Sequence, residues 1–123
     1  MRIFRLFLLA SWGLCLGGIL VVSLIPLPPL PPNTDKPLHA LVFAGVSALT
    51  FVAFGRGKSV LIALGVVVVV GLVSEAGQIW VPGRYASLLD LLANMVGIVL
   101  GIPLGRIAAA RMRRVLLSYK RSK

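Results

Sequence analysis

Four long apolar runs limit what this chain can fold into more than any other feature. They cover residues 6–25, 38–55, 60–80 and 88–108 of the 123-residue sequence. At a helical rise of 1.5 Å per residue, each run spans roughly 27–31 Å, close to the hydrocarbon thickness of a bilayer. Membrane-spanning strands would instead alternate apolar with polar residues over shorter segments. We therefore predict an all-α fold, an integral membrane bundle of four transmembrane helices in a single domain over 1–123.

The composition excludes an ordinary soluble domain. Hydrophobic residues make up 59% of the chain, charged residues make up 13%, and the mean hydropathy is +1.01. Soluble domains contain about 25% charged residues. The single cysteine, Cys15, excludes an intrachain disulfide. Arg2 and Arg5 before the first run also resemble the start of a signal peptide, but the run is long and lacks a small-x-small cleavage motif, so we expect an uncleaved helix.

The positions of the basic residues predict how the bundle is oriented. Of the 13 lysines and arginines, seven lie from Arg106 onward, two lie in the first five residues and two lie in the turn at 55–59. These three segments share one side of a four-helix bundle, so the positive-inside rule puts both termini in the cytoplasm. We predict a multi-pass protein of the bacterial inner membrane. Residues 109–123 form a basic cytoplasmic tail that meets anionic lipid, and we predict no nucleic-acid partner.

Eight polar residues lie near the predicted outer ends of the last three helices. The outer loops there are a proline-rich segment at 26–37 and a short turn at 81–87 built on Pro82-Gly83. At helical spacing the polar positions also share faces within each helix. We therefore predict an outward-facing polar pocket whose candidate binding residues are Asp35, Lys36, His39, Glu75, Gln78, Arg84, Asp90 and Asn94.

Some of these residues also have ordinary structural explanations. Ser87 and Asp90 have the spacing of a capping box, in which each side chain bonds the backbone of the other residue. Glu75 comes five residues before Trp80 and therefore lies roughly 7 Å below the membrane interface, where a carboxylate needs a partner. Arg84, on the adjoining turn, is the natural partner in the sequence. A Glu75–Arg84 pair of this kind would be purely structural.

A metal site is a further alternative for part of the cluster. Asp35 and His39 are four residues apart on one helix, and Glu75 from the next helix would supply a third ligand. Nothing in the spacing fixes the coordination geometry. We therefore predict no metal and no cofactor.

Glycines at helical spacing predict close packing between helices. Gly97, Gly101 and Gly105 form two overlapping G-x-x-x-G pairs in the fourth predicted helix, and Gly13 with Gly17 forms another in the first. Small residues at this spacing let two helices approach closely without competing with lipid.

The polar segments resemble the VanZ-like family of small bacterial membrane proteins. The matching stretches are DKPLHALVF at 35–43 and SEAGQIWVPGRYASLLDLLANMVGIVLG at 74–101. They carry D-K-x-x-H, E-x-x-Q, P-G-R, an Asp six residues after the Arg, and an Asn four further on. The resemblance implies that the eight pocket candidates are the family's recurring polar positions. Members often have a further acid between the Arg and the Asp, which this chain lacks. The family is linked to resistance to teicoplanin, a glycopeptide that acts on cell-wall precursors outside the membrane.

Two classes of function fit such a pocket, and we favour the first. In the first, the protein is not an enzyme and binds or modulates a cell-envelope lipid or glycolipid. Lys36 and Arg84 would hold a phosphate or carboxylate, and sugar or amide groups would be oriented by Gln78, Asp90 and Asn94. In the second, a membrane enzyme acts on a lipid-linked substrate, with Glu75 as general base and His39 as proton carrier. A transporter is a third alternative, which a four-helix chain would form as a homo-oligomer. Against it, the deep segments of the last two predicted helices, before Arg106, are mostly Val, Leu, Ile and Gly without a charge, so no path through the membrane is visible.

Overall fold

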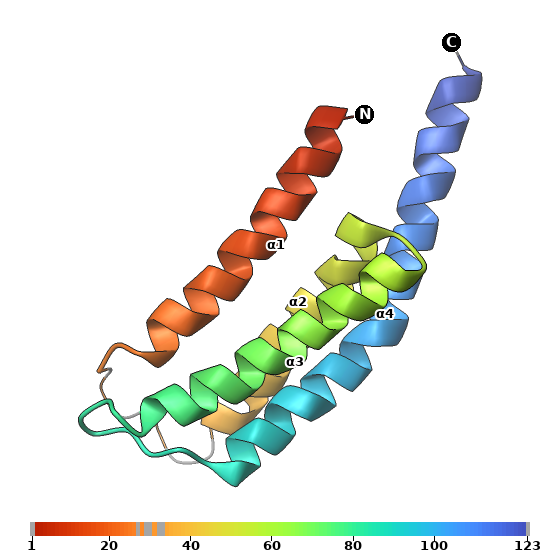
Figure 1. Cartoon of the computed structure of the whole chain (residues 1–123). Coiled ribbons are helices and arrows are strands. Elements are labelled where there is room, and N and C mark those ends of the chain that lie inside the picture. Colours follow the sequence, from red (N-terminus) through yellow and green to blue (C-terminus); the bar gives the residue numbers. More distant parts are fainter. Residues whose placement is uncertain (1, 27, 29–30, 32–33, 123) are drawn as a thin grey trace.

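The computed structural model describes residues 2–26, 28, 31 and 34–122. Several residues of the loop at 26–37, which we predict to be extended, therefore lie outside the described part of the chain. The described residues contain no strand and are helical apart from short connections. The helices follow in the order α1 (Arg2–Ser23), α2 (Asp35–Phe54), α3 (Lys58–Gln78) and α4 (Leu88–Arg121) (Figure 1).

Each of the four helices is long and apolar enough to cross a membrane. The predicted all-α class, with four helices of membrane-spanning length, is therefore confirmed. Both chain ends lie at one end of the bundle (Figure 1). The start of α2, the end of α3 and the start of α4 lie together at the opposite end, so the polar residues of three separate helices meet there.

The helix bounds differ most from the prediction at the fourth helix. α4 has 34 residues and continues through Pro103 to Arg121, whereas the predicted helix ends at 108. The alanine, leucine and arginine residues that follow are strong helix formers and extend the helix beyond bilayer length. The predicted tail at 109–123 is thus mostly helical. Apolarity marks the part of a helix that a bilayer can cover, and a helix can continue past it.

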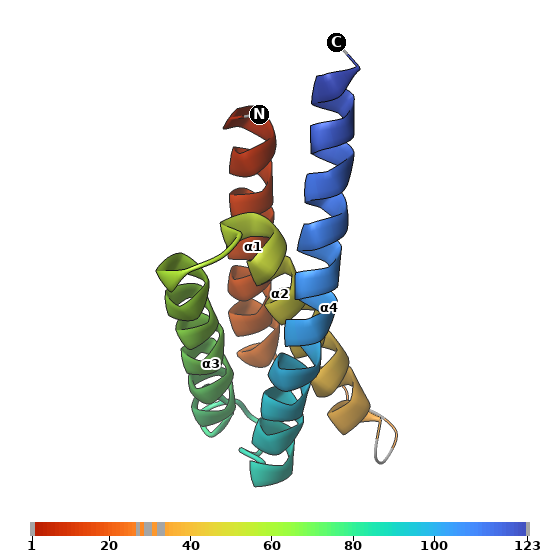
Figure 2. The same cartoon turned by 90° about the vertical axis from the view of Figure 1, so that its right-hand side faces the viewer.

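The closest helix pair is α2 with α4, and glycine makes the approach possible. A Cβ atom added at Gly97 or Gly101 would meet the backbone carbonyl oxygen of Ala40 or Ala44. One added at Gly105 would lie 2.7 Å from the carbonyl oxygen of Ala48. The predicted packing role of these three glycines is therefore confirmed. Figure 2 shows the two helices crossing along this line of contact.

α1 packs much more loosely than the other helices. Its buried residues are only Leu16 and Ser23. Trp12 anchors it, since the indole N–H donates to Thr50 Oγ1 at 2.9 Å and the ring meets Phe54 edge to face, with centroids 4.9 Å apart. Nothing lies within 4 Å of a Cβ atom added at Gly13 or Gly17. The prediction that this second glycine pair brings helices of the chain together is therefore wrong.

Candidate functional site

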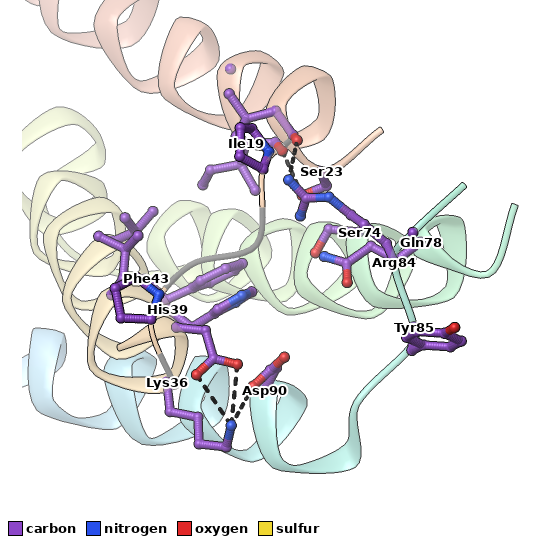
Figure 3. A pocket seen from close by; sticks show the side chains of 18 residues that line it. Ile19, Ser23, Lys36, His39, Phe43, Ser74, Gln78, Arg84, Tyr85 and Asp90 are labelled. Carbon is purple, nitrogen blue, oxygen red and sulfur yellow. Dashed lines mark hydrogen bonds and ion pairs between the residues drawn. The ribbon is translucent and has the colours of Figure 1, made fainter. Parts of the chain in front are cut away.

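A cavity of about 920 Å³ lies between the C-terminal end of α1, the N-terminal part of α2 and the C-terminal part of α3. The turn before α4 and the first residues of α4 close it (Figure 3). One wall is apolar and comes from α1 and α2; it consists of Ile19, Val22, Leu38, Val42 and Phe43. Polar and charged side chains line the remainder. The cavity is thus amphiphilic, with its apolar and polar parts supplied by different helices.

The eight predicted pocket residues come together at this end of the bundle. Glu75 and Asn94 do not line the cavity but are buried beside His39, with exposed fractions of 5% and 0%. The other six line it: Asp35, Lys36, His39, Gln78, Arg84 and Asp90. Residues of three helices and one loop therefore form a single polar cluster, of which two members form the inner layer.

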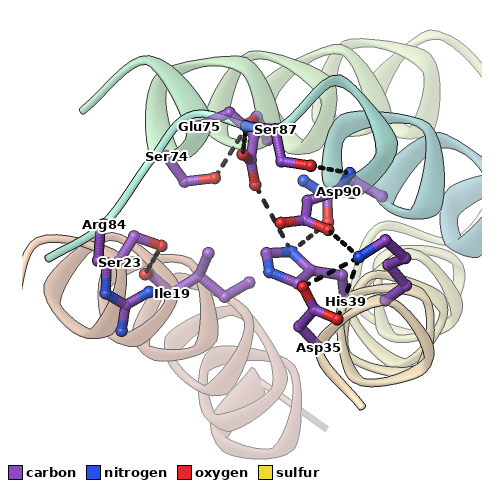
Figure 4. A network of polar contacts seen from close by, with 12 residues as sticks. Ile19, Ser23, Asp35, His39, Ser74, Glu75, Arg84, Ser87 and Asp90 are labelled. Atoms are coloured by element: carbon purple, nitrogen blue, oxygen red, sulfur yellow. Dashed lines mark hydrogen bonds and ion pairs between the residues drawn. The ribbon is translucent and has the colours of Figure 1, made fainter. Parts of the chain in front are cut away.

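His39 connects the cavity to the inner layer. Its Nδ1 lies 2.9 Å from Asn94 Oδ1 and 3.7 Å from Glu75 Oε1 (Figure 4). Both neighbouring oxygens accept hydrogen bonds, so this arrangement assigns a proton to Nδ1. The imidazole is therefore held by α3 and α4 while its ring remains partly accessible from the cavity, with 22% of the side chain exposed.

Glu75 completes the cap at the start of α4. The Ser87 hydroxyl oxygen accepts a hydrogen bond from the Asp90 backbone N–H at 3.3 Å, as a capping box predicts. The reciprocal bond from Ser87 N–H goes to Glu75 Oε2 at 3.3 Å. The prediction that Asp90 itself would make this bond is therefore wrong. A carboxylate from α3 does so instead, and the Asp90 carboxylate turns into the polar cluster.

Arg84 does not pair with Glu75, so that prediction is also wrong. Gly83 has a φ of 78° and Arg84 N–H donates to the Val81 carbonyl at 3.1 Å, which confirms the predicted turn. The turn directs the guanidinium toward α1, where Nη2 donates to the Val22 carbonyl at 3.3 Å. Carbonyls at a helix C-terminus carry partial negative charge, which attracts this cation. The remaining guanidinium donors lie at the cavity.

Lys36 has its charge matched by neighbouring acids. Its ammonium lies 3.1 Å from Asp35 Oδ2 and 3.6 Å from Asp90 Oδ1. The second interaction joins the start of α2 to the start of α4 (Figure 3). Lys36 therefore bridges two acids. Arg84 also lines the cavity, and among the described residues no carboxylate lies within ion-pair distance of it.

The cluster leaves several buried polar atoms without a hydrogen-bond partner. They are Glu75 Oε1, Asp90 Oδ1 and Asn94 Nδ2. Folded proteins satisfy the great majority of such atoms, because each unsatisfied one costs about 1–3 kcal/mol. All three occur in one place, around the imidazole of His39. Helix capping alone therefore does not explain the polar cluster.

Sequence reasoning missed the apolar wall and the inner cap. Ile19 and Val22 belong to α1, whose one polar residue at the cavity, Ser23, hydrogen-bonds its own helix and lies in a long apolar run. The bond between Ser87 and Glu75 joins residues on different helices, and no spacing rule encodes it. No protein-family model, curated protein or solved structure matches the chain. The interpretation of the site therefore rests on its geometry.

Proposed function

We propose that the protein binds or modulates an anionic lipid or glycolipid of the bacterial cell envelope. The observation that carries this proposal is the amphiphilic cavity of about 920 Å³. Its apolar wall suits an acyl or polyprenyl chain, and its polar part suits a headgroup. Ligand pockets of roughly 300–1,000 Å³ with a few convergent polar groups are typical of small-molecule sites.

Arg84 is the residue that we assign to the anionic group of the ligand. It lines the cavity and is bound to protein only through the Val22 carbonyl among the described residues. A guanidinium offers several N–H donors in a planar arrangement that matches phosphate or carboxylate oxygens. Lys36 is less suited to this role than the sequence indicates, because Asp35 and Asp90 already neutralise it. Gln78, buried on the cavity wall, is placed to bond sugar or amide groups.

The membrane setting is part of the same proposal. We propose that all four helices span the bacterial inner membrane with both termini in the cytoplasm, as the basic residues at 2–5, 55–59 and 106–123 predict. The cavity then opens on the outer side, where envelope lipids carry their sugars. The resemblance of residues 35–43 and 74–101 to the VanZ-like family, with its link to teicoplanin, fits this location. The helical basic segment at the other end would contact anionic lipid of the inner leaflet.

Lipid binding by matched arginine variants tests the proposal. Wild-type protein in detergent is titrated with a polyprenyl-phosphate glycolipid and followed by native mass spectrometry. Arg84→Ala is expected to weaken binding by about tenfold to a hundredfold, because it removes charge-assisted hydrogen bonds of about 1.5–3 kcal/mol. Arg56→Ala, in the turn at the opposite end of the bundle, removes the same charge outside the cavity and should bind as wild type does.

The neutral polyprenol and phosphatidylglycerol serve as competitors in the same titration. The proposal predicts that the glycolipid is preferred to both, because only it combines a long chain, an anionic group and a sugar. An equal loss of lipid affinity in Arg84→Ala and Arg56→Ala would indicate unspecific charge attraction. That result, or no saturable binding by wild type, would overturn the proposal.

A membrane enzyme for a lipid-linked substrate is the second candidate. One observation favours it: Glu75 Oε1 lies 3.7 Å from His39 Nδ1, the arrangement of a carboxylate that orients a general base. His39 lines the cavity and Glu75 does not, so His39 would contact the substrate and Glu75 would position it. Incubation with the same glycolipid separates the two candidates. Turnover would appear as a product of changed mass that is lost in His39→Gln, whereas a binding protein returns the lipid unchanged.

A further inference from the structure

Three side chains of the metal-ligand type converge beside the cavity. His39 on α2, Glu75 on α3 and Asp90 on α4 each offer one ligand atom, and these atoms lie within 4.8 Å of one another. They come from three different helices, as Figure 4 shows. Asp35, which the sequence suggested as a ligand, is instead bound to Lys36 at 3.1 Å and is more exposed. The set of possible ligands therefore differs from the one that spacing alone indicated.

Two of the ligand-type oxygens have no hydrogen-bond partner. Glu75 Oε1 and Asp90 Oδ1 are both buried atoms, on residues that are 5% and 7% exposed. The nearest cation to Asp90 Oδ1 is the Lys36 ammonium, at 3.6 Å, which is beyond hydrogen-bond distance. Glu75 Oε1 is directed toward His39 Nδ1 at 3.7 Å. Both oxygens are thus buried in the polar cluster without a hydrogen bond.

The charge of the cluster is also unbalanced. When ionised, Asp35, Glu75 and Asp90 contribute three negative charges. In the described part of the chain, Lys36 is the one permanently positive group within ion-pair distance of these acids. Arg84, whose guanidinium bonds the neutral Val22 carbonyl, is not within ion-pair distance of any of the three acids. With ionised acids and a neutral imidazole, the other charged residues of the cluster have a net charge of −2. An uncompensated charge is costly among apolar helices, and a divalent cation would cancel this one.

We propose that His39, Glu75 and Asp90 bind a divalent transition-metal ion such as Zn²⁺. Imidazole nitrogen favours ions of this class, whereas Mg²⁺ and Ca²⁺ favour sites made of oxygen alone. Ligand atoms around a zinc ion at about 2.1 Å are roughly 3–3.5 Å apart. The 3.7 Å between Glu75 Oε1 and His39 Nδ1 is already close to that separation. A small rotation of the Asp90 side chain completes the set.

Binding of the ion displaces a proton. The Nδ1 proton of His39 lies between two oxygens, Asn94 Oδ1 at 2.9 Å and Glu75 Oε1 at 3.7 Å. The metal takes its place, and the proton moves to Nε2, so that the neutral imidazole coordinates through Nδ1 and keeps one N–H group. Asn94 Oδ1 is then adjacent to the ion and is available as a further oxygen ligand. Because His39 and Asp90 line the cavity, the remaining coordination positions face the ligand site.

Metal binding goes beyond the proposed function and is measured without lipid. Tag-free protein in detergent is stripped with EDTA, exchanged into chelator-free buffer and titrated with Zn²⁺ by calorimetry. We expect one ion per chain and a raised melting temperature. His39→Gln and Glu75→Gln should each weaken binding at least about a hundredfold, more than loss of an outer-shell partner does. Arg56→Ala, in the turn between α2 and α3 at the opposite end of the bundle, should bind as wild type does.

Pulsed electron paramagnetic resonance of the Cu²⁺-loaded wild type provides a readout that needs no variant. The chain has one histidine, so a signal from one coordinated imidazole identifies His39. No saturable Zn²⁺ binding by wild type, or a copper spectrum without imidazole coupling, would overturn the proposal. Wild-type affinity in Glu75→Gln, or its loss in Arg56→Ala, would overturn the assigned ligands. Failure of the lipid titration would leave these results unaffected, since no lipid is present.

Discussion

Gly101→Ala is expected to destabilise the protein by about 1–3 kcal/mol, the usual cost of adding a methyl group where there is no room. The new Cβ atom would meet the Ala44 carbonyl oxygen and lie 2.6 Å from the Cβ atom of Ser47. The first of these is a backbone atom, so α2 as a whole must shift away from α4. Ser47 also donates to the Ile98 carbonyl at 3.0 Å, and the shift would stretch that bond. Thermal unfolding in detergent measures the loss.

Gly17→Ala is the matched control for this prediction. It makes the same substitution in the middle of α1, where nothing lies within 4 Å of the added atom. Alanine favours a helix over glycine by about 1 kcal/mol, so this variant should be as stable as wild type or slightly more stable. An equal loss of stability in Gly101→Ala and Gly17→Ala would contradict the view that the contact of α2 with α4 is the tight core of the bundle.

Glu75→Gln is expected to raise the melting temperature when EDTA is present. The amide oxygen of glutamine can still accept the hydrogen bond that Ser87 N–H now gives to the carboxylate. The change removes one of two negative charges whose oxygens lie within 4.8 Å of each other. At an effective dielectric constant of 20, two unit charges 4.8 Å apart repel by about 3.5 kcal/mol. Because Lys36 offsets part of it, we expect a gain of about 1–2 kcal/mol, the stability cost that functional sites often carry.

Asp35→Asn and added Zn²⁺ provide the controls. Asp35 is an exposed partner of Lys36, so its loss should leave the melting temperature unchanged. With Zn²⁺ the wild type should have a higher melting temperature than Glu75→Gln, because only the wild type gains stability from the ion. A lower melting temperature for Glu75→Gln in EDTA would mean that Glu75 mainly clamps the start of α4, and the polar cluster would then be architecture.

The sequence predicts much of the fold because bilayer-length apolar runs admit few structures. It also predicts that the fourth helix packs closely through the G-x-x-x-G positions Gly97, Gly101 and Gly105, although it does not identify α2 as the partner. The same motif at Gly13 and Gly17 fails, because the motif permits close approach without supplying a partner. Helix ends are poorly predicted for a related reason. Hydropathy does not distinguish where α4 leaves the apolar region from where it ends at Arg121.

The members of the polar cluster are predictable from the sequence, whereas their pairing is not. Spacing along a helix brings Asp90 close to Ser87, but which carboxylate bonds Ser87 N–H depends on how α3 packs beside α4. The sequence predicts that Arg84 pairs with Glu75, yet the turn directs Arg84 to the end of α1. Neither contact follows from local rules, because both join segments whose relative position only tertiary packing fixes.

The proposed function places the cavity on the outer side of the membrane, and cysteine accessibility tests that placement most directly. In a Cys15→Ser background the chain has no other thiol. Tyr85→Cys puts one at the cavity mouth, where the side chain is 86% exposed. Ser59→Cys puts one at an exposed position in the first turn of α3, at the opposite end of the bundle. Intact cells are treated with a membrane-impermeant maleimide, and labelling is compared before and after permeabilisation.

Labelling of Tyr85→Cys in intact cells, with Ser59→Cys labelled only after permeabilisation, is the predicted result. The opposite pattern would put the cavity in the cytoplasm, away from the sugars of envelope glycolipids, and would contradict the proposed function at its starting point.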